Sequence, residues 1–243
     1  MSVQNSPALD AGSVRRTLVM AGAGALAAAS LFGFAAPQAR AAEACSDVEV
    51  VFARGTAEPA GVGRVGQAFV DALKGELKNE TVSVYAVNFP ASYDFMKATE
   101  GATDASAHVQ ATAAACPNTS IVLGGFSQGA AVIDGITGDP SALFGLGQPM
   151  PPEVANHVAA VAVFGNPLDR FVGPLTTLSP LYGAKTIDLC NGADPVCSHG
   201  DDRAAHSLYP EAGLTSQAAD FVAGRVASHS TAAVAIQASG TTP

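Results

Sequence analysis

The stretch 119–129, TSIVLGGFSQG, places a tight glycine turn directly after an apolar run. The apolar run is long enough for a strand that is buried on both faces, and the residues after the turn are compatible with a helix. Its last five residues match G-x-S-x-G, a pattern that between a strand and a helix is typical of a nucleophile elbow. Residues two positions from the serine must be small in so tight a turn, as the two glycines are. We therefore predict that Ser127 is an exposed nucleophile.

Short β-rich runs alternate with helical stretches on both sides of this turn. Such alternation favours a mostly parallel sheet that is covered by helices on both faces. The expected strands are 48–53, 81–87, 119–125, 158–164 and 184–189, and the expected helices are 63–77, 99–115, 128–136 and 216–227. The Gly- and Pro-rich stretch 139–152 is expected to be a loop that exposes Phe144, Leu146 and Met150, and whether it covers the cleft stays open.

Composition is that of a globular protein with one domain. The chain has 243 residues, of which 48% are hydrophobic and 14% are charged. The formal net charge is -9 and the basic residues are scattered, which disfavours nucleic-acid binding. The absence of any C-x-x-C pair disfavours a zinc site, so no metal is expected.

The N-terminus reads as a leader. Arg15 and Arg16 precede an uncharged, Ala-rich stretch over 18–36, and Ala39-Arg40-Ala41 follows as a cleavage pattern. We expect residues 1–41 to be a secretory signal peptide, and the paired arginines also fit a twin-arginine signal. An uncleaved membrane anchor is the competing interpretation. The mature protein would then be a domain over 42–228, followed by a flexible tail over 229–243.

Four cysteines lie outside the leader, which in an oxidising compartment predicts two disulfides. Three pairings are possible. Cys190 and Cys197 are seven residues apart and flank turn residues, so the spacing favours a local bond between them. That choice leaves Cys45 to pair with Cys116.

A serine hydroxyl needs a histidine base, and the histidine needs a carboxylate that orients it. In this kind of fold the acid follows the serine and the histidine comes last. Asp194 lies in the loop that the local disulfide would close, where a carboxylate would be held in place. We favour it over the other carboxylates, which are Asp169, Asp188, Asp201 and Asp202.

Two histidines, His199 and His206, are the candidates for the base. His199 is only five residues beyond Asp194, whereas His206 has more chain with which to reach over the sheet edge. We favour His206. His157 precedes an expected strand and His229 lies in the expected tail, so neither suits the role.

An oxyanion needs two converging N–H donors. The Gln128 N–H stands at the start of the helix that follows the serine, where it would be one donor. Thr56, in the turn after the first strand, would be the other.

Four motifs, in this order along the chain, resemble the cutinase family. They are FARGT at 52–56 with Glu58, GFSQG at 125–129, CNGADPVC at 190–197, and Ala205-His206 followed by Tyr209. They cover the chain from about Cys45 to Val226. With the leader and the Ala-rich tail, they make the chain similar to the cutinase-like serine esterases of actinobacteria.

The resemblance implies a small α/β-hydrolase, a three-layer α/β/α sandwich around a five-stranded, mainly parallel sheet. It implies hydrolysis of carboxylic esters with no metal or organic cofactor. The implied residues are the triad Ser127, Asp194 and His206, the oxyanion donors Thr56 and Gln128, and the disulfides Cys45–Cys116 and Cys190–Cys197. Val196, Leu208 and Phe89 are candidates to line the acyl groove, although apolar residues such as these more often serve plain packing.

Three functions are therefore weighed. The first is a secreted, monomeric carboxylesterase that acts on short- to medium-chain lipids or polyesters and makes transient contact with a lipid or polymer surface. The second is an acetyl-xylan-type polysaccharide deacetylase. The third is a catalytically silent binding protein of the cell surface or cell wall on the same scaffold.

Overall fold

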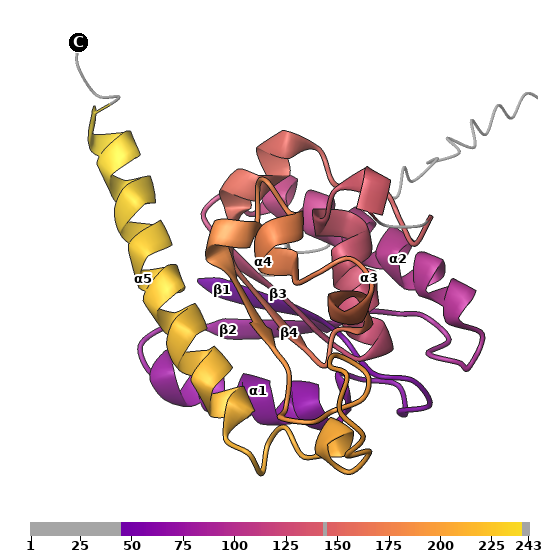
Figure 1. The fold of residues 1–243 in the computed structure, drawn as a ribbon. Helices are drawn as coiled ribbons and strands as arrows, with labels where there is room; N and C mark the ends of the chain where they lie inside the picture. The colour runs from indigo at the N-terminus through magenta and orange to yellow at the C-terminus, as the bar shows by residue number, and fades with distance from the viewer. Residues whose placement is uncertain (1–44, 143–144, 240–243) are drawn as a thin grey trace, which may run out of the picture. The chain divides into compact units, whose positions relative to one another are not determined.

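The computed structural model describes residues 45–142 and 145–239 (Figure 1). The predicted leader, Phe144 and residues 240–243 lie outside this part of the chain. None of the described helices is long and apolar enough to cross a membrane.

A single sheet of five strands forms the centre of the fold, and every neighbouring pair is parallel. The strands are β1 (Val48–Ala53), β2 (Val82–Ala86), β3 (Ser120–Phe126), β4 (Val158–Phe164) and β5 (Thr186–Leu189). Their order across the sheet is β2-β1-β3-β4-β5. The five-stranded parallel sheet expected from the sequence is confirmed. Strand β3 lies in the middle and is buried along its whole length, as its uninterrupted apolar sequence predicts.

Helices cover both faces of the sheet (Figure 1). On one face lie α2 (Ala98–Ala115) and α3 (Gln128–Thr137), and on the other lie α1 (Gly63–Glu76) and α5 (Leu214–Ser239). A short helix, α4 (Leu175–Leu178), precedes β5. Alternate residues of β1 point to opposite faces, so that Val51 joins the α2/α3 core and Phe52 the α1/α5 core. The three-layer α/β/α arrangement is therefore confirmed.

Helix α5 replaces most of the flexible tail that the sequence predicts. The helix continues to Ser239. Residues 227–238 are Ala-rich and contain neither Gly nor Pro, so nothing in them ends a helix. His229 also attaches α5 to the sheet layer, because its Nδ1 lies 3.1 Å from Ser120 Oγ and its Nε2 lies 2.8 Å from the Asn156 backbone oxygen.

The loop after α3 buries two of the side chains that the sequence places in solvent. Leu146 is 8% exposed and Met150 is 3% exposed. The Met150 N–H donates to the Ile136 carbonyl at 2.9 Å, which holds this segment against α3. The expectation of exposed apolar side chains is therefore wrong for Leu146 and Met150.

Candidate active site

Ser127 occupies a strained turn between β3 and α3. Its φ is 55° and its ψ is −119°, a left-handed conformation that a non-glycine residue rarely adopts. A side chain at Gly125 would collide with the backbone of Gly129, and one at Gly129 would collide with the carbonyl of Ala53. The Ser127 N–H donates to the Phe164 carbonyl of β4 at 2.9 Å, which fixes the turn to the sheet. The elbow predicted from the sequence is therefore present with the crowding that demands its two glycines.

A continuous chain of hydrogen bonds joins Ser127 to His206 and Asp194. His206 Nε2 lies 2.9 Å from Ser127 Oγ, and His206 Nδ1 lies 2.7 Å from Asp194 Oδ2. Two further donors reach Asp194: Tyr209 Oη donates to Oδ2 at 2.7 Å, and the Val196 N–H donates to Oδ1 at 2.8 Å. The structure thus brings together the three residues that the sequence selects. His199 is exposed and makes no hydrogen bond with this group.

Tyr209 is a site residue to which sequence reasoning assigns no role. The side chain is fully buried. Burial and the hydrogen bond to Asp194 raise the pKa of its phenol, so that the hydroxyl stays protonated and can donate. Its hydroxyl also accepts from the Asn191 N–H at 3.2 Å. The sequence feature that could have pointed to Tyr209 is its position three residues after His206, in a motif that the chain shares with the cutinase family.

The loop that carries Asp194 is closed by a disulfide. Cys190 and Cys197 are bonded, and so are Cys45 and Cys116. Asn191 Nδ2 donates to the Ala205 carbonyl at 2.8 Å, which attaches the Asp194 loop to the turn that carries His206. The acid and the base are therefore held together independently of their own hydrogen bond.

Thr56 and Gln128 face each other beside Ser127. Thr56 Oγ1 donates to Gln128 Oε1 at 3.5 Å. Gln128 is the first residue of α3, so its N–H has no partner within the helix and lies at the positive end of the helix dipole. Its side chain is buried, with Nε2 donating to the Ser92 carbonyl at 3.0 Å.

Arg54 and Glu58 brace the loop that carries Thr56. The Arg54 guanidinium donates to the carbonyls of Glu58 at 2.9 Å and Phe89 at 2.8 Å. Glu58 in turn accepts from the N–H groups of Gly55 and Arg64, both at 2.7 Å. Both residues belong to a motif recognised in the sequence, but only the structure assigns them this bracing contact.

A pocket of about 250 Å³ opens at Ser127. Its lining residues are Thr56, Glu58, Arg64, Val65, Phe126, Ser127, His206 and Ser207. None of the three predicted groove residues is among them. Phe89 is buried under Arg54, whose guanidinium lies 5.1 Å from its ring centre, so its side chain packs in the interior. Val196 contributes its N–H to Asp194, and Leu208 is 42% exposed next to the His206 turn.

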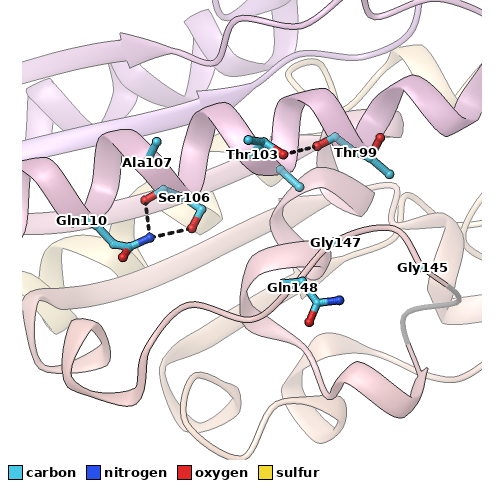
Figure 2. Close-up of a pocket in the computed structure, with 9 residues that line it drawn as sticks. Thr99, Thr103, Ser106, Ala107, Gln110, Gly145, Gly147 and Gln148 are labelled. Carbon is cyan, nitrogen blue, oxygen red and sulfur yellow. Dashed lines mark hydrogen bonds between the residues drawn. The ribbon is translucent and has the colours of Figure 1, made fainter.

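A larger groove of about 460 Å³ lies elsewhere, between α2 and residues 145–148 (Figure 2). Ser106 and Gln110 face it, and the Gln110 amide donates to the Ser106 hydroxyl at 2.9 Å (Figure 2). The residues that line it include no histidine and no carboxylate. This groove therefore has a hydroxyl nucleophile but no base to activate it.

Two carboxylates that compete with Asp194 in the sequence lie in a separate group, the acidic cluster of Asp134, Asp169 and Asp188. Both oxygens of Asp134 and one oxygen of each of the others are buried, with no hydrogen-bond partner among the described residues. Burial raises the pKa of Asp134 well above its usual range, with the Asp188 charge acting in the same direction and the Asn166 side chain opposing it. Burial and the Asp188 charge raise the pKa of Asp169 to about 8. These shifts favour the protonated, neutral forms of Asp134 and Asp169 beside the charge of Asp188.

Comparisons with known proteins identify the family of this chain. The sequence profile of the family described as Cutinase matches residues 44–226. The chain belongs to the cutinase family. It is 51% identical to the phospholipase Culp4 of Mycobacterium tuberculosis, over 89% of this chain and 94% of that one. It is also 51% identical to the carboxylesterase Culp1 of Mycobacterium bovis, over 76% of this chain and 84% of that one.

Solved structures show the same fold. A cutinase of Trichoderma reesei in complex with a phosphonate inhibitor superposes with a TM-score of 0.62 at 32% identity, covering 75% of this chain and 77% of that one. An acetylxylan esterase superposes with a TM-score of 0.65 at 24% identity, covering 75% and 99%. The latter likeness concerns the fold alone. Membership of the family makes this protein a cutinase-like serine esterase, a hydrolase of carboxylic esters.

Proposed function

We propose that this cutinase-family esterase cleaves esters through an acyl-enzyme on Ser127, with His206 as base and Asp194 as the residue that orients it. The observation that carries the proposal is the unbroken chain of hydrogen bonds from Ser127 Oγ through His206 to a buried Asp194, at 2.9 Å and 2.7 Å. A hydroxyl on a strained elbow, next to a held imidazole, is the arrangement that nucleophilic acyl transfer needs.

The reaction proceeds in two halves. Ser127 Oγ bonds to the ester carbon while His206 Nε2 takes its proton, and the N–H groups of Thr56 and Gln128 stabilise the negative oxygen. The bond to the alkoxy group then breaks, and His206 gives the proton to the departing alcohol. Water next attacks the acyl group with His206 again as base, and the acid leaves as Ser127 regains its proton.

The proposed substrates are esters of short- to medium-chain acids in lipids or polyesters. The phospholipase and carboxylesterase names of two relatives support this class. Exposed apolar side chains such as Tyr93 and Phe171, which are 89% and 74% exposed, suit transient contact with a lipid or polymer surface. We further propose that the protein is a secreted monomer. Its two disulfides support secretion, because disulfides persist in oxidising compartments.

The two other functions have less support. A catalytically silent scaffold has no need for a serine, histidine and aspartate in hydrogen-bonding register. A polysaccharide deacetylase removes an acetyl group, which leaves the apolar side chains near the site without a role.

The test is the intact mass of the protein after exposure to a p-nitrophenyl alkyl phosphonate. We expect one adduct on the wild type and none on Ser127→Ala. Ser106→Ala is the matched control, because this serine lies in the larger groove on α2 without a base, and it should still take up one adduct. A folded wild type without an adduct would make the silent scaffold the better proposal.

A further inference from the structure

The ring of Phe126 stacks on the imidazole of His206. Their ring centres are 4.9 Å apart and their planes are inclined by 30°. Phe126 is the last residue of β3 and immediately precedes Ser127, so the strand that positions the nucleophile also positions this ring. The side chain is largely buried, and the residue lines the pocket at Ser127. One face of the imidazole is therefore covered by an aromatic ring.

Two neighbours fix the Phe126 ring in this position. A side chain at Gly55 would lie 2.7 Å from Phe126 Cδ1, so the ring packs directly against the backbone of the turn before Thr56. Tyr209 meets the ring edge-on, with centres 5.7 Å apart and planes inclined by 64°. The ring is thus held both by the turn that carries Thr56 and by the phenol that donates to Asp194.

Hydrogen bonds hold His206 only at the edge of its ring. Nδ1 meets Asp194 and Nε2 meets Ser127, and both bonds lie close to the imidazole plane. Neither bond prevents the ring from tilting out of that plane. The stacked Phe126 ring does so, because a tilt would bring the two rings into collision.

The charge of His206 changes during the proposed reaction. Its imidazole becomes a cation when Nε2 takes the Ser127 proton, and it is neutral again once the proton passes to the alkoxy oxygen. The face of an aromatic ring carries negative potential and attracts a cation within about 6 Å of its centre. The stack therefore stabilises the charged imidazole of the transition state more than the neutral imidazole of the resting site, which lowers the barrier.

We propose that Phe126 is a positioning residue, which restrains the imidazole of His206 from its face and stabilises the positive charge that His206 gains. This inference rests on the proposed function, because the charge arises only if His206 acts as the base. Both half-reactions pass through the charged imidazole, so the effect belongs to kcat whichever half is slower. A cation beside an aromatic face is expected to change the rate by about fivefold.

The experiment replaces Phe126 by phenylalanines that carry one, two or three fluorine atoms on the ring. Fluorine withdraws electron density from the ring face and changes the shape of the ring little, so the attraction for a cation falls stepwise while the packing is kept. We expect kcat for p-nitrophenyl butyrate to fall with each fluorine, to about fivefold below wild type with three, while KM stays within about twofold. Thermal unfolding checks that each variant is folded.

The same three replacements at Phe69 are the matched control. Phe69 is fully buried in the same apolar core, but its ring neighbours are Phe52 and Phe164 rather than His206. Its fluorinated variants should keep kcat within about twofold of wild type, because any effect of fluorine on core packing alone would appear here as well.

Three results would overturn the inference and leave the proposed function standing. A kcat that is independent of fluorine at Phe126 would remove the effect on charge. Equal losses at Phe126 and Phe69 would assign the effect to core packing. A rising KM with constant kcat would mean that the ring meets the substrate instead of acting through His206. A wild type that neither hydrolyses the ester nor takes up the phosphonate would overturn the proposed function as well.

Discussion

Asp194 and Asp134 are two fully buried carboxyl groups with opposite surroundings. Both have an exposed fraction of 0%. Asp194 accepts hydrogen bonds from Tyr209, the Val196 N–H and His206. Neither oxygen of Asp134 has such a partner among the described residues, and its pKa is raised well above the usual range by burial. Burial alone therefore does not make a carboxyl group suitable for orienting a base; the donors around it do.

One short stretch of backbone separates the two regions. A side chain at Gly165 would lie 2.9 Å from Tyr209 Oη and 3.0 Å from His206 Cε1. The next residue, Asn166, belongs to the other region and donates from Nδ2 to Asp188 Oδ2 at 3.2 Å. The hydrogen-bonded group of Ser127, His206 and Asp194 and the acidic cluster are thus neighbours with separate hydrogen-bond networks. The same substitution in each can distinguish their roles.

The largest expected difference comes from replacing a carboxyl group by an amide. Asp194→Asn should lower kcat by about 10⁴-fold, because the amide no longer holds the imidazole in the correct tautomer. Asp134→Asn makes the same change in the acidic cluster and should alter kcat by less than about threefold. Steady-state hydrolysis of p-nitrophenyl butyrate by both variants measures this contrast. Comparable losses in the two would show that the acidic cluster takes part in catalysis.

A smaller effect is expected at Tyr209, which acts on the reaction through Asp194. Tyr209→Phe removes one hydrogen bond to a charged group, and such a bond contributes about 1.5–3 kcal/mol. We expect kcat to fall by about tenfold while KM stays within about twofold. The Asn191 N–H would also lose its acceptor, so thermal unfolding is measured in parallel. An unchanged kcat in a folded variant would mean that His206 and the Val196 N–H suffice to hold Asp194.

The acidic cluster should instead control how stability depends on pH. Its pKa values are raised in the folded state, so between 3.8 and about 8 the folded protein binds protons that the unfolded chain has released. The free energy of unfolding therefore falls as pH rises through this window and stays low above it. Asp134→Asn removes one of these groups and should make the fall shallower.

Urea unfolding of wild type and Asp134→Asn at about pH 5 and about pH 9 measures that slope. The variant should gain stability relative to wild type as pH rises. Parallel pH profiles of the two proteins would contradict the assignment of neutral acids to the cluster.

Much of the site could be predicted from local patterns, because the elbow needs particular residues at particular places. Steric crowding leaves room only for glycine at Gly125 and Gly129. The apolar run of β3 is needed because that strand is buried on both faces. The choice of Asp194 and His206 needed chain order and a resemblance, since several other acids and histidines follow Ser127. The groove residues were not predictable, because Val196, Leu208 and Phe89 are apolar residues whose neighbours no short-range pattern reveals.

The sequence by itself determined the strand–turn–helix unit at Ser127, the parallel sheet and the cysteines that can pair, because steric limits and hydrophobic periodicity act between residues close along the chain. Only the tertiary structure decided which donors each buried carboxyl group meets. Asp188, in the acidic cluster, accepts a hydrogen bond from Asn166. Asp194, only six positions later, accepts hydrogen bonds from His206 and Tyr209. That difference arises from segments distant in the chain, whose approach depends on packing against both faces of the sheet.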